Sequence, residues 1–142
     1  MAETFTPTID AFLLDHHLMS LAVTDGGAPW AANVFYVFDA PEPRLLFFTA
    51  TTTRHGALLE SDGRAAATIA GETRAIARLS GLQLEGRASV LGGAEAEAAH
   101  AVFLAKFPEI AGLDAPIWAL RPDTIKLTDN ARGFGHKEVW SR

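Results

Sequence analysis

Apolar and polar positions recur along this chain with two different periods, and these predict an opening helix followed by a series of strands. Apolar residues at positions 9, 12 and 13 have helical spacing after Pro7, so a first helix is expected to end near residues 16–17. Runs rich in Val, Ile, Phe and Thr predict strands. The expected strands cover residues 18–24, 30–38, 44–49, 64–70, 76–91 and 117–128, the last interrupted at Pro122. Two more helices are expected at residues 56–62 and 94–107.

This order of elements predicts a mainly β (α+β) fold. Five or six strands in meander order, with a few helices, are typical of a small antiparallel barrel with helices packed against it. Regular crossover helices between the strands are lacking, which argues against a doubly wound parallel sheet. Gly81 and Gly86 interrupt the long run at 76–91 and indicate bulges or sharp bends.

Length and composition place the whole chain in one globular domain, residues 1–142. It has 142 residues, of which 49% are hydrophobic and 20% charged, close to the average of globular proteins. The sequence contains no cysteine, which excludes disulfides, thiolate metal sites and cysteine nucleophiles.

The charge balance argues against two classes of partner. The net charge is −5, so neither non-specific binding to nucleic acid nor attraction to an anionic membrane surface is expected. The longest apolar runs are far shorter than the roughly 20 residues of a transmembrane helix. The first six residues lack the basic region of a secretory signal, and we expect a cytoplasmic protein.

The segment from Phe48 to His55 is the strongest candidate for chemistry. It carries hydroxyl side chains at 49, 51, 52 and 53, then Arg54 and His55, at the start of an expected helix. Hydroxyl donors, an arginine and a helix N-terminus together suit a phosphate group. A purely structural interpretation is equally open, with threonines as strand formers and helix cap and Arg54 in solvent. The chain has no P-loop and no G-x-G-x-x-G motif.

Metal and serine-hydrolase sites are not indicated. The five histidines, at 16, 17, 55, 100 and 136, do not match a metal-ligand spacing, and no serine lies in a G-x-S-x-G motif. The metal prediction is therefore none. His16 and His17 are expected near a helix C-terminus, and His136 lies in a glycine-rich tail.

From the threonine-rich turn onward the sequence resembles the pyridoxamine 5′-phosphate oxidase-like FMN-binding split barrels. Their pattern of G-x-P, a strand, Y-T-x-x-x-S-R-K, a helix and N-P-R-V compares with Gly27-Ala-Pro29, a strand, Phe48-Thr49-x-x-x-Thr53-Arg54-His55, a helix and Asp62-Gly-Arg64-Ala65. The resemblance extends over roughly 110 residues. A small, poorly characterised bacterial branch also shares the H-H-x-x-x-L-A, T-R-H-G and T-D-N…G-F-G-x-K patterns, seen here at 16–22, 53–56 and 128–137.

The resemblance implies an antiparallel split barrel that forms a homodimer, with FMN at the subunit interface and a small-molecule redox substrate. By position, Thr49, Thr53, Arg54 and His55 would face the FMN phosphate and ribityl chain. Asn33 and Val34 would lie beside the flavin ring. The family's glutamine falls at Gly81, with Gln83 on the same face two residues later.

Several departures from the oxidase pattern affect the expected substrate. Ala32 and Val37 stand where the oxidase has Arg and Lys, and Thr128 stands where it has Trp. The R-L-H-D-R substrate motif is absent, and the loop 133–137 occupies its region. Pyridoxamine phosphate is therefore not the expected substrate.

Two alternatives to an FMN-dependent oxidoreductase stay open. One is a haem-binding or haem-degrading protein on the same barrel, with His136 or His16 as axial ligand. The other is a cofactor-free, non-enzymatic dimer.

Overall fold

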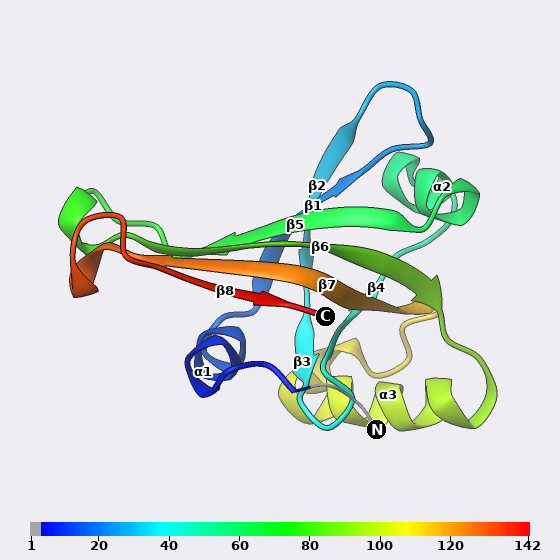
Figure 1. Ribbon diagram of the computed structural model, residues 1–142. Coiled ribbons are helices and arrows are strands. Elements are labelled where there is room, and N and C mark those ends of the chain that lie inside the picture. Colours follow the sequence, from blue (N-terminus) through cyan, green and yellow to red (C-terminus); the bar gives the residue numbers. More distant parts are fainter. Residues whose placement is uncertain (1–3) are drawn as a thin grey trace.

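A single antiparallel sheet curls into a half-barrel in the computed structural model, which describes residues 4–142 (Figure 1). Residues 1–3, which the expected domain includes, lie outside the described part. The helices are α1 (Pro7–Asp15), α2 (Arg54–Ser61) and α3 (Gly93–Lys106), with 3-10 turns η1 (Ile76–Arg78), η2 (Pro108–Ile110) and η3 (Asn130–Arg132). The strands are β1 (Leu18–Val23), β2 (Trp30–Phe35), β3 (Val37–Asp39), β4 (Arg44–Phe48), β5 (Arg64–Ala70), β6 (Ser80–Val90), β7 (Ile117–Asp129) and β8 (Lys137–Ser141).

The strand order differs from the expected meander. It runs β2-β1-β5-β6-β7-β4-β3, and β8 pairs with β7 beside β4. The first half of β7 pairs with β4 and the second half with β8, while β6 pairs along its other edge. The split barrel is confirmed, but two neighbour pairs, β1 with β5 and β4 with β7, join strands that are distant in the sequence.

Tyr36 divides the expected strand 30–38 into β2 and β3. Its side chain is fully buried, and its hydroxyl donates a hydrogen bond of 2.8 Å to the carbonyl oxygen of Leu13 in α1. The chain changes its partner strand at this residue, because β2 pairs with β1 up to Phe35 and β3 pairs with β4 from Val37 onward. The prediction of one continuous strand was therefore wrong.

Three other local predictions need correction. Residues 76–78 form η1, so the long strand begins at Ser80. Strand β7 continues through Pro122, because a register shift opposite Gly86 accommodates the proline. A Cβ on Gly86 would lie 2.0 Å from the carbonyl oxygen of Arg121, which explains a glycine at this bulge. The bulge or bend expected at Gly81 is not present, because Gly81 pairs in regular register with Thr128.

Two apolar layers hold the elements together. The larger core fills the concave side of the sheet, where α1 contributes Ile9 and Leu13. The smaller core lies between α3 and the strands β3, β4 and β7, with Phe103 and Leu46 among its members. In Figure 1, α3 runs below β3 and β4, and α2 lies beside the β1–β2 hairpin.

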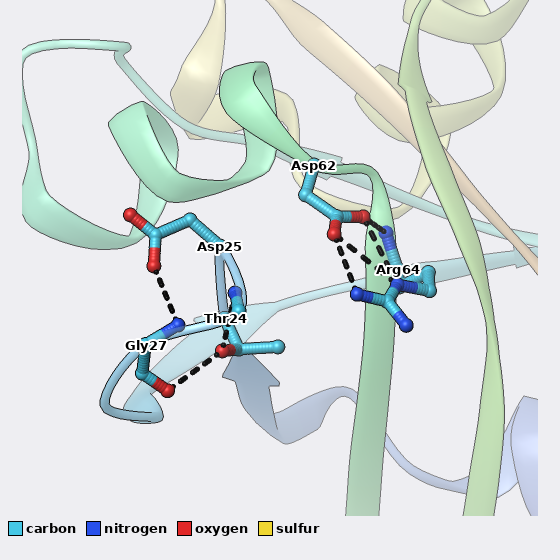
Figure 2. A network of polar contacts seen from close by, with 6 residues as sticks. Thr24, Asp25, Gly27, Asp62 and Arg64 are labelled. Atoms are coloured by element: carbon cyan, nitrogen blue, oxygen red, sulfur yellow. Dashed lines mark hydrogen bonds and ion pairs between the residues drawn. The ribbon is translucent and has the colours of Figure 1, made fainter.

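The hairpin tip and the end of α2 are each fixed by local polar contacts, drawn in Figure 2. The Asp25 carboxylate accepts from the backbone N–H of Gly27 at 3.0 Å, and the Thr24 hydroxyl donates to the Gly27 carbonyl oxygen at 3.2 Å. Arg64 and Asp62 form an ion pair of 2.8 Å. Hydrogen bonding from the Arg64 guanidinium lowers the pKa of Asp62 to about 2. These contacts hold the turn between β1 and β2 and the link between α2 and β5 in place.

Within residues 4–142, no helix is long and apolar enough to cross a membrane.

Candidate functional site

A cavity of about 790 Å³ opens between the edge strand β2, the end of β4 and the segment from α3 to η2. This volume lies within the usual range of small-molecule sites. Of the residues predicted to bind a cofactor, the cavity brings together Asn33, Val34, Thr49, Thr53 and His55. Arg54 and Gln83 do not line it.

Thr49, Thr53 and His55 form the polar end of the cavity. The Thr49 hydroxyl lies 2.6 Å from His55 Nε2 and 3.4 Å from the Thr53 hydroxyl. Thr49 directly follows β4, and its carbonyl oxygen accepts a 3.2 Å hydrogen bond from the indole N–H of buried Trp118. Its backbone N–H donates to the carbonyl oxygen of Pro116 at 3.3 Å, so both backbone groups of Thr49 are held in place.

Thr53 serves mainly as the cap of α2. Its hydroxyl donates to the carbonyl oxygen of Ala50 at 2.7 Å and accepts from the backbone N–H of Gly56 at 3.0 Å. The structural interpretation of this threonine is therefore confirmed. The first turn of a helix leaves N–H groups without acceptors inside the helix, here those of Arg54 and His55. The Thr49 hydroxyl and the His55 imidazole contact each other, and a ligand at this end would have to share or replace that contact.

Burial changes the acid–base behaviour of His55. Removing the imidazole from water disfavours its charged form, which lowers the pKa of His55 below its ordinary value. The ring is therefore neutral at pH 7 in the free protein.

Arg54, which follows the helix cap Thr53, stacks on Trp30. The guanidinium carbon lies 3.9 Å from the centre of the Trp30 ring, a cation–π contact between α2 and the first residue of β2. Trp30 is 42% exposed, and its ring holds the guanidinium of Arg54 next to β2. The contact of Arg54 with a phosphate stays a prediction.

Asn33 and Gln83 share one face of the sheet, but on strands that are far apart. A polar row in register crosses the sheet through Asn33, Ser20, Thr68, Gln83 and Lys126. Three strand spacings of about 4.8 Å separate Asn33 from Gln83. Gln83 lines a separate cavity of about 280 Å³, so its contact with the flavin stays a prediction.

The histidines proposed as haem ligands lie outside the main cavity of their own chain. His16 caps the C-terminus of α1, and its Nδ1 lies 2.8 Å from the carbonyl oxygen of Phe12. His136 is exposed between η3 and β8. Among the described residues, no group of three or more His, Cys, Asp or Glu side chains could hold a metal ion.

Four phenylalanines also line the cavity, which the sequence did not reveal. Phe35 comes from β2, Phe48 from β4, and Phe103 and Phe107 from α3 and its C-terminus. The spacing of four residues between Phe103 and Phe107 indicated a shared helix face. Only the fold, however, places that face against β2 and β4.

Comparison with known proteins identifies the family. The profile of the family described as pyridoxamine 5′-phosphate oxidase matches residues 5–128. A UPF0306 protein of Photorhabdus laumondii, plu4501, is 39% identical over 134 residues, which cover 94% of each chain.

Solved structures share the fold. A haem-binding protein from Mycobacterium smegmatis superposes with a TM-score of 0.73 at 22% identity, covering 99% of this chain and 60% of the other. An FAD-binding protein from Mesorhizobium loti gives 0.68 at 12% identity, covering 99% and 98%. With the profile match over most of its length and the UPF0306 relative, the chain belongs to the pyridoxamine 5′-phosphate oxidase-like superfamily, in the bacterial branch of the UPF0306 proteins.

Proposed function

We propose that the cavity binds FMN and that the protein is an FMN-dependent oxidoreductase acting on a small molecule other than pyridoxamine phosphate. The observation that carries this proposal is the polar end formed by Thr49 and His55 at the N-terminus of α2. Hydroxyl and imidazole donors beside unpaired helical N–H groups are chemically suited to a phosphate ester.

Other residues of the site are suited to the remaining parts of FMN. Thr49, His55 and the first turn of α2 would hold the phosphate, with Arg54 released from Trp30 to add a charged donor. Asn33 and Val34 line the wall beside the polar end and would contact the ring. FMN supplies redox chemistry when bound, while the chain's residues bind it and orient the second reactant.

A homodimer is part of this proposal. Ala31, Ala22 and Ala66 stand in register across β2, β1 and β5, and Ala31 and Ala66 are exposed. Such a row of small side chains gives the sheet a flat face on which a second copy could pack. In that assembly, Gln83 would contact FMN held in the cavity of the neighbouring subunit.

We place haem second to the flavin for this cavity. A haem needs an axial ligand, and neither His16 nor His136, the two ligands expected from the sequence, lines the cavity. The histidines that line it are His17 and His55, and the FMN proposal uses His55 for the phosphate. The haem-binding relative is only 22% identical, which supports a common fold and no more.

Titration with FMN, followed by quenching of flavin fluorescence, tests the proposal. The wild-type protein is expected to saturate. Arg54→Ala is expected to weaken binding by about 1.5–3 kcal/mol, the range for a hydrogen bond to a charged group. Arg74→Ala, an exposed arginine in the loop after β5, should leave the affinity unchanged. A wild-type protein that shows no saturation would refute FMN binding, and an unaltered affinity in Arg54→Ala would remove Arg54 from the site.

The affinity for FMN should rise as the pH falls. In the free protein, His55 is neutral at pH 7 because burial lowers its pKa. A bound phosphate favours the charged imidazole and raises that pKa, so binding takes up a proton. Affinity is then highest below the free-state pKa and decreases as the pH rises through the bound-state pKa.

Titrations between pH 5.5 and 8 measure this dependence. His55→Gln keeps a polar side chain but cannot titrate in this range, and it should lose the rise in affinity at low pH. The phosphate group of FMN also titrates, with a pKa near 6, and because it does so in both proteins the His55→Gln titration serves as the control for that effect. The same slope in both proteins would contradict a role for His55.

A further inference from the structure

The cavity is also lined by a continuous run of aromatic rings, Phe35, Phe107, Phe103 and Phe48, which we call the phenylalanine run. The ring centres of Phe35 and Phe107 are 5.5 Å apart, those of Phe107 and Phe103 are 5.3 Å apart, and those of Phe103 and Phe48 are 4.9 Å apart. Ile110 and Leu113 extend the apolar lining. Three separate elements thus combine to present aromatic surface to one cavity.

Phe35 is the least protected member of the phenylalanine run. In the single chain its side chain is 56% exposed, although it lines the cavity and contacts two other rings, those of His17 and Phe107. Covering such a ring with an apolar ligand removes apolar surface from water, which favours binding. Flat ligands gain in addition from stacked or edge-to-face contacts with the rings.

The charges around the phenylalanine run select against anions. Among the described residues that line the cavity there is no lysine or arginine, and Glu109 is the only carboxylate. Lys106 lies outside this lining; its ammonium group donates to the carbonyl oxygen of His16 at 3.0 Å and lies 5.8 Å from the centre of the Phe107 ring. A negatively charged ligand in the cavity would therefore lie beside the Glu109 carboxylate, whereas the polar end has donors for one phosphate.

We propose that the phenylalanine run binds a planar aromatic compound without negative charge as the second ligand of the FMN site. This inference rests on the proposed function for the identity of the first ligand, but it depends on different residues. It gives the substrate class: a flat, uncharged molecule, in contrast to the phosphorylated substrate for which the family is named.

Calorimetric titration with 1,4-naphthoquinone and its 2-sulfonate, with and without FMN, tests the inference. The two probes share one ring system and differ in charge, and the chain has no cysteine to react with a quinone. The uncharged probe is expected to bind at least about tenfold more tightly, a difference of about 1.4 kcal/mol. Equal affinities would overturn the proposal.

Variants locate the binding. Phe35→Ala should lower the affinity for the uncharged probe by about tenfold or more. Leu14→Ala removes an exposed apolar side chain from α1 and should leave that affinity unchanged. Glu109→Lys should strengthen binding of the sulfonate. An unchanged affinity for the uncharged probe in Phe35→Ala would refute the assignment to the phenylalanine run.

The two proposals fail separately. FMN binding fails to saturate in one possible outcome, while the two probes still differ in affinity and Phe35→Ala still weakens the uncharged one. That result would refute the flavin proposal and support the proposal for the phenylalanine run. If FMN binds but the probes do not differ, the substrate class is wrong and the cofactor assignment remains.

Discussion

Replacing Arg44 with Ala is expected to destabilise the protein by about 3–5 kcal/mol, the range for breaking a buried ion pair. The Arg44 side chain is only 4% exposed and that of Asp39 only 8%. The Nε atom of Arg44 lies 2.9 Å from a carboxylate oxygen of Asp39, and the Nη1 atom of Arg44 lies 2.5 Å from a carboxylate oxygen of Glu95 on α3. Arg44 thus joins β3, β4 and α3, and its loss leaves the Asp39 carboxylate buried without a cation.

Urea denaturation followed by tryptophan fluorescence measures this loss. Arg64→Ala is the matched control, because Arg64 also pairs with an aspartate but is exposed, and its removal should leave the midpoint nearly unchanged. The double variant Arg44→Met with Asp39→Leu should recover part of the stability, since the lone carboxylate is then gone. Equal losses in Arg44→Ala and Arg64→Ala would show that burial does not set the strength of the pair.

Gly56→Ala is expected to impair both stability and cofactor binding. A Cβ at this position would lie 2.1 Å from the carbonyl oxygen of Ala50 and 2.8 Å from the Thr53 hydroxyl. The first turn of α2 must then move away from the end of β4, which separates His55 from Thr49. We expect a cost of about 1–3 kcal/mol in the free energy of unfolding. We also expect an affinity for FMN lower by about tenfold or more.

Urea denaturation and the FMN titration, run on the same variant, separate the two effects. In Gly71→Ala the added Cβ would meet only His16 Nε2, at 3.9 Å, an ordinary contact distance, so that variant should behave as wild type. A Gly56→Ala protein with wild-type affinity would show that the packing of α2 on the turn is unimportant for the site.

Elements with a clear local period could be predicted from the sequence, whereas strand neighbours could not. In β6 the apolar residues Leu82 and Leu84 alternate with the polar residues Gln83 and Glu85, and the observed burial follows this alternation. Strand β8 was missed because Lys137–Ser141 is short and mostly polar, and it forms only because the long β7 offers it a free edge. The pairing of β1 with β5 depends on contacts across more than 40 residues, which no local pattern encodes.

One part of the candidate site could be predicted from the sequence and the other could not. Its polar end lies within one stretch, Thr49 to His55, so residue types and order were enough to indicate it. The phenylalanine run joins side chains separated by as many as 72 positions, from Phe35 to Phe107. Arg54 was predicted correctly to lie at the turn, but its stacking on Trp30 depends on how α2 packs against the hairpin.

The double pairing of β7 also affects how the protein fluctuates. Strands on both sides supply hydrogen-bond partners along β7, so its amides exchange with solvent only when the sheet itself opens. Among the described strands, β2 has a neighbour on one side alone, and its outer amides exchange through small local openings. Trp118 of β7 holds Thr49, while Asn33 sits on β2. We therefore expect slow amide exchange on the β7 side of the cavity, which opens only with the whole domain, and much faster exchange on the β2 side.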